Sequence, residues 1–143
     1  MLLEEFTPES ELVVRETYVE KPKFPVYDSH SHWGRLLLGD DYPSAYDTKE
    51  VVENLKESGV AGICNVDGFW GDELDKMLAK TEESDGFIMT FSSVDVTRLY
   101  ERGFESYVYK TIATAKSKGV KGLKFWKVIG LLYKNQDGTY LRP

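Results

Sequence analysis

The two histidines of this 143-residue chain, His30 and His32, are separated by one residue in the stretch FPVYDSHSHWG, and Asp28 precedes them at the same spacing. On a β-strand, residues i, i+2 and i+4 point to one face, so these three side chains are predicted to face the same way. Two imidazoles on one face can bind a single Zn²⁺ ion, whose nitrogen ligands lie at about 2.0–2.1 Å. Zinc lowers the pKa of its bound water from about 15.7 to roughly 7, which makes hydroxide accessible at neutral pH. The spacing therefore indicates a metal site that activates water.

A catalytic zinc normally has three protein ligands, and the chain has no third histidine. Asp67 and Asp95 follow later predicted strands and are geometrically possible ligands, although a loop cap or a turn residue is the favoured interpretation for each. Asp28, deeper on the strand, could orient a metal ligand from behind. The alternative is that both histidines are ordinary hydrogen-bonded loop residues.

The elements that must position these residues alternate between strand and helix. Such alternation implies parallel strands joined by right-handed helical crossovers. The strands are short, continuously apolar runs, as expected where both faces of a sheet are covered. Predicted strands span residues 24–29, 60–66, 87–94 and 120–126; predicted helices span residues 48–58, capped by Asp47 or Thr48, 72–84 and 104–118; loops cover residues 33–46, 67–71 and 127–143.

Two α/β architectures are compatible with this order. An open doubly wound sheet that binds phosphates would show a glycine-rich turn after its first strand, and neither GxGxxG nor GxxxxGK[ST] is present. A (β/α)₈ TIM barrel carries its functional residues at the carboxyl ends of its strands, which is where His30 and His32 lie. A full barrel takes about 250 residues, so only about the first four strands are expected here. We predict an N-terminal arm, residues 1–23, packed on a half-barrel of residues 24–143.

Composition excludes several classes of protein. The net charge of −6 and the pI of about 5.0 argue against a nucleic-acid partner, which normally selects a basic surface. No apolar run approaches the roughly 18 residues that a membrane span needs, and the first residues do not resemble a signal peptide. The single cysteine, Cys64, lies in an apolar run and is expected to be a buried free thiol. We therefore expect a cytoplasmic protein that does not bind membranes.

The stretch FPVYDSHSHWG resembles the first strand of the amidohydrolase superfamily, with its H-x-H motif. Three further stretches resemble the amidohydrolase-2 branch of metal-dependent hydrolases and related decarboxylases. They are VENLKESGVAGICNVDG, ELDKMLAKTEESDGFIMTFSSVD and AKSKGVKGLKFWKVIGLLYKNQDGTYLRP. TatD-type nucleases and PHP phosphoesterases open in a similar way, but the last stretch favours the amidohydrolase-2 branch.

The resemblance implies that His30 and His32 are the first-strand ligands of a divalent metal ion, with zinc expected. The family takes its other ligands and its acid/base groups from a histidine on strand five, often another on strand six, and an aspartate on strand eight. None of these strands is in the chain. The resemblance therefore implies the N-terminal half of a longer enzyme, whose acid/base residues lie beyond Pro143.

Two cations near the predicted site have alternative interpretations. In some members of the superfamily a carbamylated lysine on strand four bridges two metals, and Lys124 lies near that position. Alternatively, Lys124 forms an internal ion pair or extends toward the end of the barrel. Arg35 could bind a substrate carboxylate through its planar guanidinium, or it is simply a surface arginine. Trp33, Phe69 and Trp70 would surround the mouth of the site.

Three functions are consistent with the sequence. The first is a metal-dependent hydrolase whose activated water attacks an amide, ester or lactone carbon of a small molecule. The second is a metal-dependent decarboxylase on the same fold. The third is a half-barrel that has no activity alone and associates, as a homo-oligomer or with a second half, through its open sheet edges.

Overall fold

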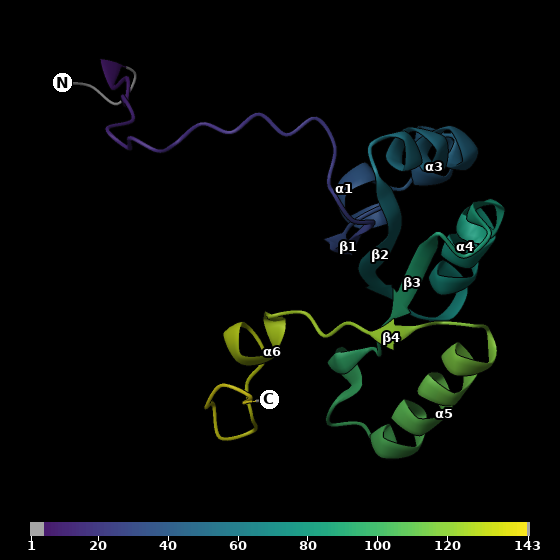
Figure 1. The fold of residues 1–143 in the computed structure, drawn as a ribbon. Coiled ribbons are helices and arrows are strands. Elements are labelled where there is room, and N and C mark those ends of the chain that lie inside the picture. Colours follow the sequence, from purple (N-terminus) through teal and green to yellow (C-terminus); the bar gives the residue numbers. More distant parts are fainter. Residues whose placement is uncertain (1–4, 143) are drawn as a thin grey trace.

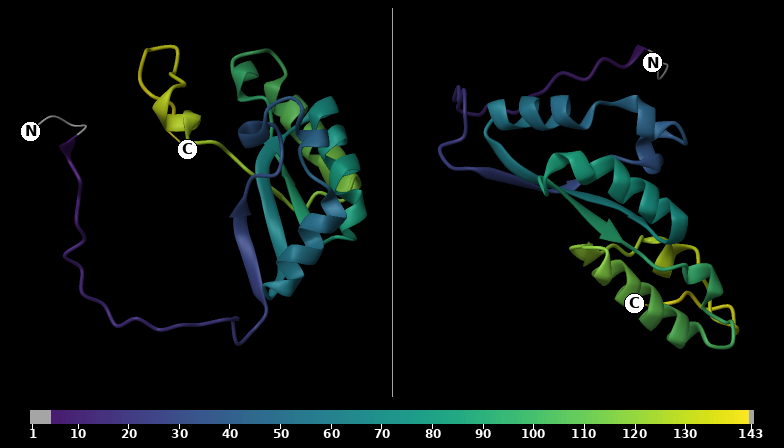
Figure 2. Two further views of the ribbon diagram at one scale, coloured as in Figure 1. Left: turned by 90° about the horizontal axis from the view of Figure 1, so that it is seen from above. Right: turned by 90° about the vertical axis from the view of Figure 1, so that its right-hand side faces the viewer.

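The computed structural model describes residues 5–142, and its centre is a parallel sheet of four strands in the order β1-β2-β3-β4 (Figure 1). All three strand pairs are parallel. The sheet is curled, with β1 at one edge and β4 at the other (Figure 2). The predicted α/β class with parallel strands is confirmed. The strands are β1 (Val26–Ser31), β2 (Val60–Phe69), β3 (Ile88–Ser92) and β4 (Gly122–Leu123).

Three long helices follow the first three strands and cover the same side of the sheet (Figure 2). These are α3 (Thr48–Glu57), α4 (Gly71–Thr81) and α5 (Phe104–Ser117). The start of α3 is fixed by the predicted cap, since the Asp47 side chain accepts a hydrogen bond from the Glu50 amide. Its end is fixed by Gly59, whose φ of +86° is the left-handed conformation that glycine adopts without strain. This arrangement leaves the other side of the curled sheet for the predicted site.

The core lies between the sheet and these helices. Val52, Ile63, Phe87 and Ile88 form one buried cluster, and Met77 of α4 is fully buried. β1 differs from the other strands because five of its six residues are exposed. In the part of the chain that the structure describes, no helix is long and apolar enough to cross a membrane.

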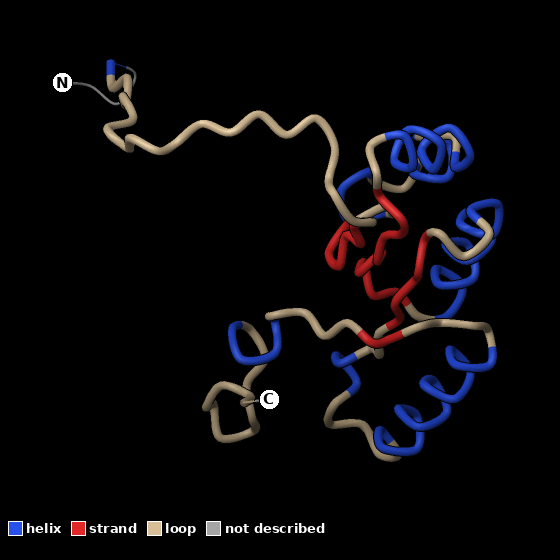
Figure 3. The backbone as a smooth tube through the Cα atoms, viewed as in Figure 1, coloured by secondary structure: helices blue, strands red, loops and turns tan. Residues whose placement is uncertain are grey.

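The structure corrects several predicted boundaries (Figure 3). The predicted loop 33–46 contains two short helices, α1 (Arg35–Leu38) and α2 (Tyr42–Ala45). β2 continues to Phe69 because its last carbonyl accepts hydrogen bonds from the Ser92 hydroxyl and the Ser93 amide. β4 is shorter than predicted. Short turns complete the chain: η2 (Glu82–Ser84), η3 (Val96–Arg98) and α6 (Val128–Leu131), which is kinked at Gly130.

The N-terminal arm does not pack on the domain, contrary to expectation. Residues 6–25 form no helix or strand, and the arm extends away from the sheet (Figure 1). Its apolar side chains are exposed, with Val13 at 95% and Tyr18 at 90%. Charged residues interrupt the apolar ones throughout this segment, so it offers no continuous apolar face to bury.

Tyr46 provides a pH-dependent test of the packing beside the site. Its hydroxyl donates a hydrogen bond to the Trp33 carbonyl oxygen at 2.9 Å, and the Lys80 Nζ atom lies 4.4 Å from its ring centroid. Burial, helped by the charge of Asp67, raises the pKa of Tyr46 to about 12. The neutral phenol therefore stabilises the fold fully below pH 10, and this contribution is lost as the pH rises toward 12.

We expect Tyr46→Phe to lower the free energy of unfolding at pH 7 by about 1 kcal/mol, the net value of one hydrogen bond. The difference from wild type should shrink above pH 10, because only the wild-type unfolded state gains stability by ionising this phenol. Urea unfolding at pH 7, 9 and 11 measures both effects, with Tyr109→Phe, at an exposed tyrosine, as the matched control. A difference that stays constant with pH would contradict the assigned environment of Tyr46.

Candidate metal centre

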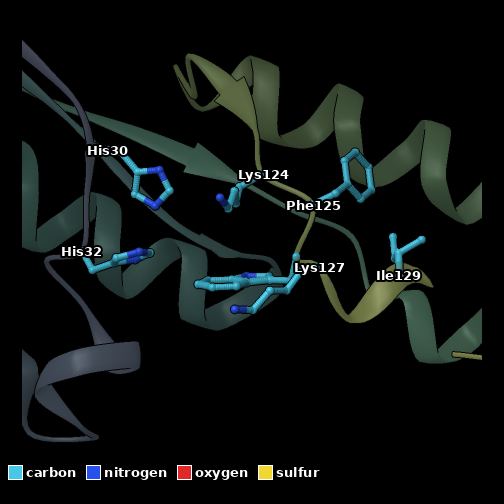
Figure 4. A pocket seen from close by; sticks show the side chains of 7 residues that line it. His30, His32, Lys124, Phe125, Lys127 and Ile129 are labelled. Atoms are coloured by element: carbon cyan, nitrogen blue, oxygen red, sulfur yellow. The ribbon is translucent and has the colours of Figure 1, made fainter. Parts of the chain in front are cut away.

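The two histidines lie side by side at the carboxyl end of β1 (Figure 4). Their ring centroids are 5.3 Å apart in an edge-to-face arrangement. Both line one cavity of about 790 Å³. His30 is the exposed member of the pair, whereas the His32 side chain is only 15% exposed. The cavity is completed by Lys124, Phe125, Trp126, Lys127 and Ile129 from the segment that follows β4.

The His32 ring is held from two sides. Its Nδ1 atom lies 2.6 Å from Asp67 Oδ1, and Asp67 belongs to the neighbouring strand β2. The ring of Trp126 stacks on the His32 ring, with centroids 5.5 Å apart and planes 24° from parallel. Trp126 Nε1 also donates a hydrogen bond to the Asp67 carbonyl oxygen at 3.1 Å. Two segments far from His32 in the sequence therefore fix its imidazole.

Asp67 is a buried carboxyl group, with only 1% of its side chain exposed. Loss of hydration raises the pKa of Asp67, while the hydrogen bond to His32 and the backbone amides of Gly34 and Leu36 act in the opposite direction. Among the residues that the structure describes, none donates a hydrogen bond of normal geometry to its Oδ2 atom. Because a buried carboxylate without a partner is costly, the contact with His32 is the main compensation available to this group.

Asn65 fixes the path of the chain behind the site. It is fully buried, and its Oδ1 atom accepts hydrogen bonds from the Trp33 amide at 3.1 Å and the Asp67 amide at 3.3 Å. This residue ties the segment after β1 to β2 and so holds His32 opposite Asp67. The sequence analysis missed Asn65. The available signal was a polar residue inside the apolar run VAGICNV.

The other predicted site residues occupy different surroundings. Asp28 accepts a hydrogen bond from the backbone amide of His30 at 2.9 Å, so its carboxylate contacts the strand backbone and not a histidine ring. Arg35, in α1, pairs with Asp40 on the surface. Arg35 also lines a second cavity of about 630 Å³ beside the first.

Lys124 shares the histidine cavity (Figure 4). Its Nζ atom lies 5.4 Å from the centroid of the Trp126 ring. The structure therefore brings a lysine to the two histidines, from directly after β4 and not from within the strand as predicted, and adds Lys127 on the same wall.

The structure places the two aspartates that were considered as further ligands in different surroundings. Asp67 is neither a loop cap nor a turn residue, because β2 extends past it and buries it against His32. Asp95 is a cap, since its Oδ1 atom accepts a hydrogen bond from the Thr97 amide at the start of η3. Cys64 is a free, partly buried cysteine in β2.

Within residues 5–142, no three histidine, cysteine or acidic side chains gather closely enough to hold a metal ion alone. Imidazole nitrogens are nonetheless among the ligands that zinc uses in proteins, and a carboxylate commonly accepts the second N–H of such an imidazole. The described residues therefore fit part of a metal site, which needs further ligands from outside this sheet.

Comparison of the chain with models of protein families, with curated proteins and with solved structures gives no match in any of the three cases. Functional conclusions therefore rest on the geometry of the cluster formed by His30, His32 and Asp67.

Proposed function

We propose that this chain forms the metal-binding part of a metal-dependent hydrolase of the amidohydrolase type, on a (β/α)₈ barrel of which the described sheet supplies four strands. His30 and His32 bind a divalent ion, with zinc the expected metal. The observation that supports this most strongly is the placement of both rings on one cavity, 5.3 Å apart, at the carboxyl end of a parallel strand.

A bound zinc ion would supply water of lowered pKa for attack on an amide, ester or lactone carbon. The residues of this chain hold and shape the site. His30 and His32 provide the nitrogen ligands, and the rings of Phe125 and Trp126 line the cavity beside them. The group that moves the proton comes from strands outside the described sheet.

A metal-dependent decarboxylase is the second candidate, and one observation supports it. Lys124 and Lys127 both line the histidine cavity, so their positive charges favour a small-molecule substrate that carries a carboxylate. Hydrolysis and decarboxylation differ in their products, because only the second releases CO₂.

We also propose that the chain associates, with a second copy or with the strands that complete its barrel. Each of the edge strands β1 and β4 pairs with only one neighbour in the described sheet. Exposed strand edges and exposed apolar side chains favour association. Tyr27 of β1, Phe125 after β4 and Val13 of the arm are all exposed apolar or aromatic residues.

We propose the cytoplasm as the location of the protein, because the free thiol of Cys64 is compatible with a reducing compartment.

We expect the sedimentation coefficient of the purified chain to increase with concentration through the micromolar range. The physical reason is the burial of the open sheet edges on association. Analytical ultracentrifugation measures this directly, with thermal unfolding recorded on the same samples. A monomer at all concentrations that also unfolds in one sharp, cooperative transition would contradict the proposal.

The test of the proposed function begins with the metal. After equilibrium dialysis against Zn²⁺, we expect one bound zinc per wild-type chain and none in the His30→Ala/His32→Ala double variant. Assays of the zinc-loaded chain on esters, lactones, amides and aromatic carboxylates, with CO₂ release recorded separately, then distinguish hydrolysis from decarboxylation. Turnover is expected only where the strands outside the described sheet are present to supply the proton-transfer group. Equal zinc retention by wild type and the double variant would overturn the assignment.

A further inference from the structure

We propose that Asp67 is a positioning residue for the metal site: it holds the proton of His32 on Nδ1, so that Nε2 is the atom presented to the metal. This inference rests on the proposed metal site and adds a residue from outside the H-x-H motif. It concerns which of the two ring nitrogens binds, a choice that sets the direction from which the metal must approach.

The contact geometry supports this assignment. A carboxylate accepts hydrogen bonds and has none to donate, so an ionised Asp67 requires a proton on the nitrogen that it contacts. The separation of 2.6 Å between Nδ1 and Oδ1 is shorter than the roughly 2.7–2.9 Å of a charge-assisted N–H···O hydrogen bond, so the two atoms are in direct hydrogen-bond contact. With Nδ1 engaged in this way, the free lone pair of the neutral ring is on Nε2.

The surroundings keep the pair in place. Asp67 is buried in β2, and its amide is anchored by Asn65, so the carboxylate has little freedom to leave the ring. Trp126 covers a face of the His32 ring and is itself hydrogen-bonded to the Asp67 backbone. Asp28 does not take this role in the observed arrangement, since its Oδ1 atom accepts from the His30 backbone amide and not from a histidine ring. Metal-bound histidines generally donate their second N–H to such a partner.

The first test needs no substitution and no metal. Long-range ¹H–¹⁵N NMR of the zinc-free, full chain reports which nitrogen of each neutral imidazole carries the proton. We expect His32 to be protonated on Nδ1, with His30 serving as the internal comparison. A proton on Nε2 of His32 would overturn the proposal, because a protonated Asp67 would then be donating to Nδ1.

The second test uses Asp67→Asn. The asparagine amide can donate a hydrogen bond to Nδ1, which would move the ring proton to Nε2 and block the metal-binding nitrogen. We expect the affinity for Zn²⁺ to fall about 10- to 100-fold, together with a shift of the His32 tautomer in the NMR spectrum. Asp95→Asn is the matched control, because the hydrogen bonds of Asp95 are to Thr97 at the start of η3 and to the Tyr107 hydroxyl, not to a histidine, and it should leave both readouts unchanged.

The outcomes separate this inference from the proposed function. If wild type binds no zinc, the proposed function fails, while the tautomer of His32 still decides the role of Asp67. If wild type binds zinc and Asp67→Asn binds it within twofold of the same affinity, the positioning role fails and the metal site stands. If Asp67→Asn does not fold, the tautomer of wild-type His32 decides the question alone.

Discussion

Replacing His32 with alanine is expected to lower the affinity of the chain for Zn²⁺ by more than about 100-fold. Loss of a residue that only hydrogen-bonds a metal ligand lowers metal affinity by about 10- to 100-fold, and loss of the ligand itself should cost more. The variant removes an imidazole that is fixed on two sides, by Asp67 and by the Trp126 ring. A ligand that is already held in one orientation loses little freedom when it binds, so its removal carries a large effect. Competition with a chromophoric zinc chelator measures the affinity.

His30→Ala is expected to reduce the affinity less than His32→Ala. His30 is exposed. Among the aromatic side chains of residues 5–142, the His30 ring contacts that of His32 and no other. Ser44→Ala, an exposed position of α2, is the control for substitution at the surface. A zinc affinity in His32→Ala equal to that of wild type would remove His32 from the site.

Gly34→Ala is expected to give the largest loss of stability among single-methyl additions near the site. A Cβ atom at Gly34 would collide with Met77 Cε, with Asp67 Oδ2 and with the Phe69 ring. Met77 is fully buried and Asp67 nearly so, which leaves neither side chain an easy way to move. Overpacking a well-filled core costs about 1–3 kcal/mol, and displacement of a buried carboxylate places this variant near 3 kcal/mol.

For a chain of this size, that loss corresponds to a decrease in Tm of about 10 °C. The matched control is Gly103→Ala, where an added Cβ meets nothing within 4 Å and only the left-handed backbone, at φ +85° and ψ 12°, opposes the side chain. That backbone cost is about 1–2 kcal/mol. Calorimetry of both variants separates steric overlap from backbone strain. Equal losses at the two positions would show that the contacts around Gly34 are not tight.

The same substitution links stability to metal binding. Because the added methyl group would occupy the space of Asp67 Oδ2, the carboxylate must shift away from the start of α1. We therefore expect Gly34→Ala to weaken zinc binding as well, whereas Gly103→Ala should not. This comparison uses the same competition assay as the histidine variants.

The parts of the fold that the sequence predicts well are those set by local signals. The α3 helix has its Asp47 cap and its Gly59 terminator within one short segment, and the three long helices and the parallel order of the strands follow from the same kind of pattern. The short helices α1 and α2 lack such patterns. Their segment is fixed by tertiary contacts, such as the hydrogen bond from Tyr46 to the Trp33 carbonyl.

The candidate site likewise has features that the sequence predicts and features that it does not. The spacing of His30 and His32 is visible in the sequence, and the structure places both on one cavity. The partner of His32 is not visible, because Asp67 is 35 residues away and reaches the ring through the pairing of β1 with β2. The stacking of Trp126 depends likewise on where the chain turns after β4. Contacts of this kind come from strand register and loop path, which no local pattern encodes.

The central claim is that His30 and His32 bind one metal ion together, and X-ray absorption at the zinc edge tests it most directly. The full chain is loaded with one equivalent of Zn²⁺ and compared with the double variant His30→Ala/His32→Ala. We predict a wild-type spectrum with scattering from two imidazole rings, whose nitrogens lie about 2.0–2.1 Å from zinc, and loss of that scattering in the variant. A wild-type spectrum without imidazole scattering, or one identical to that of the variant, would contradict the claim.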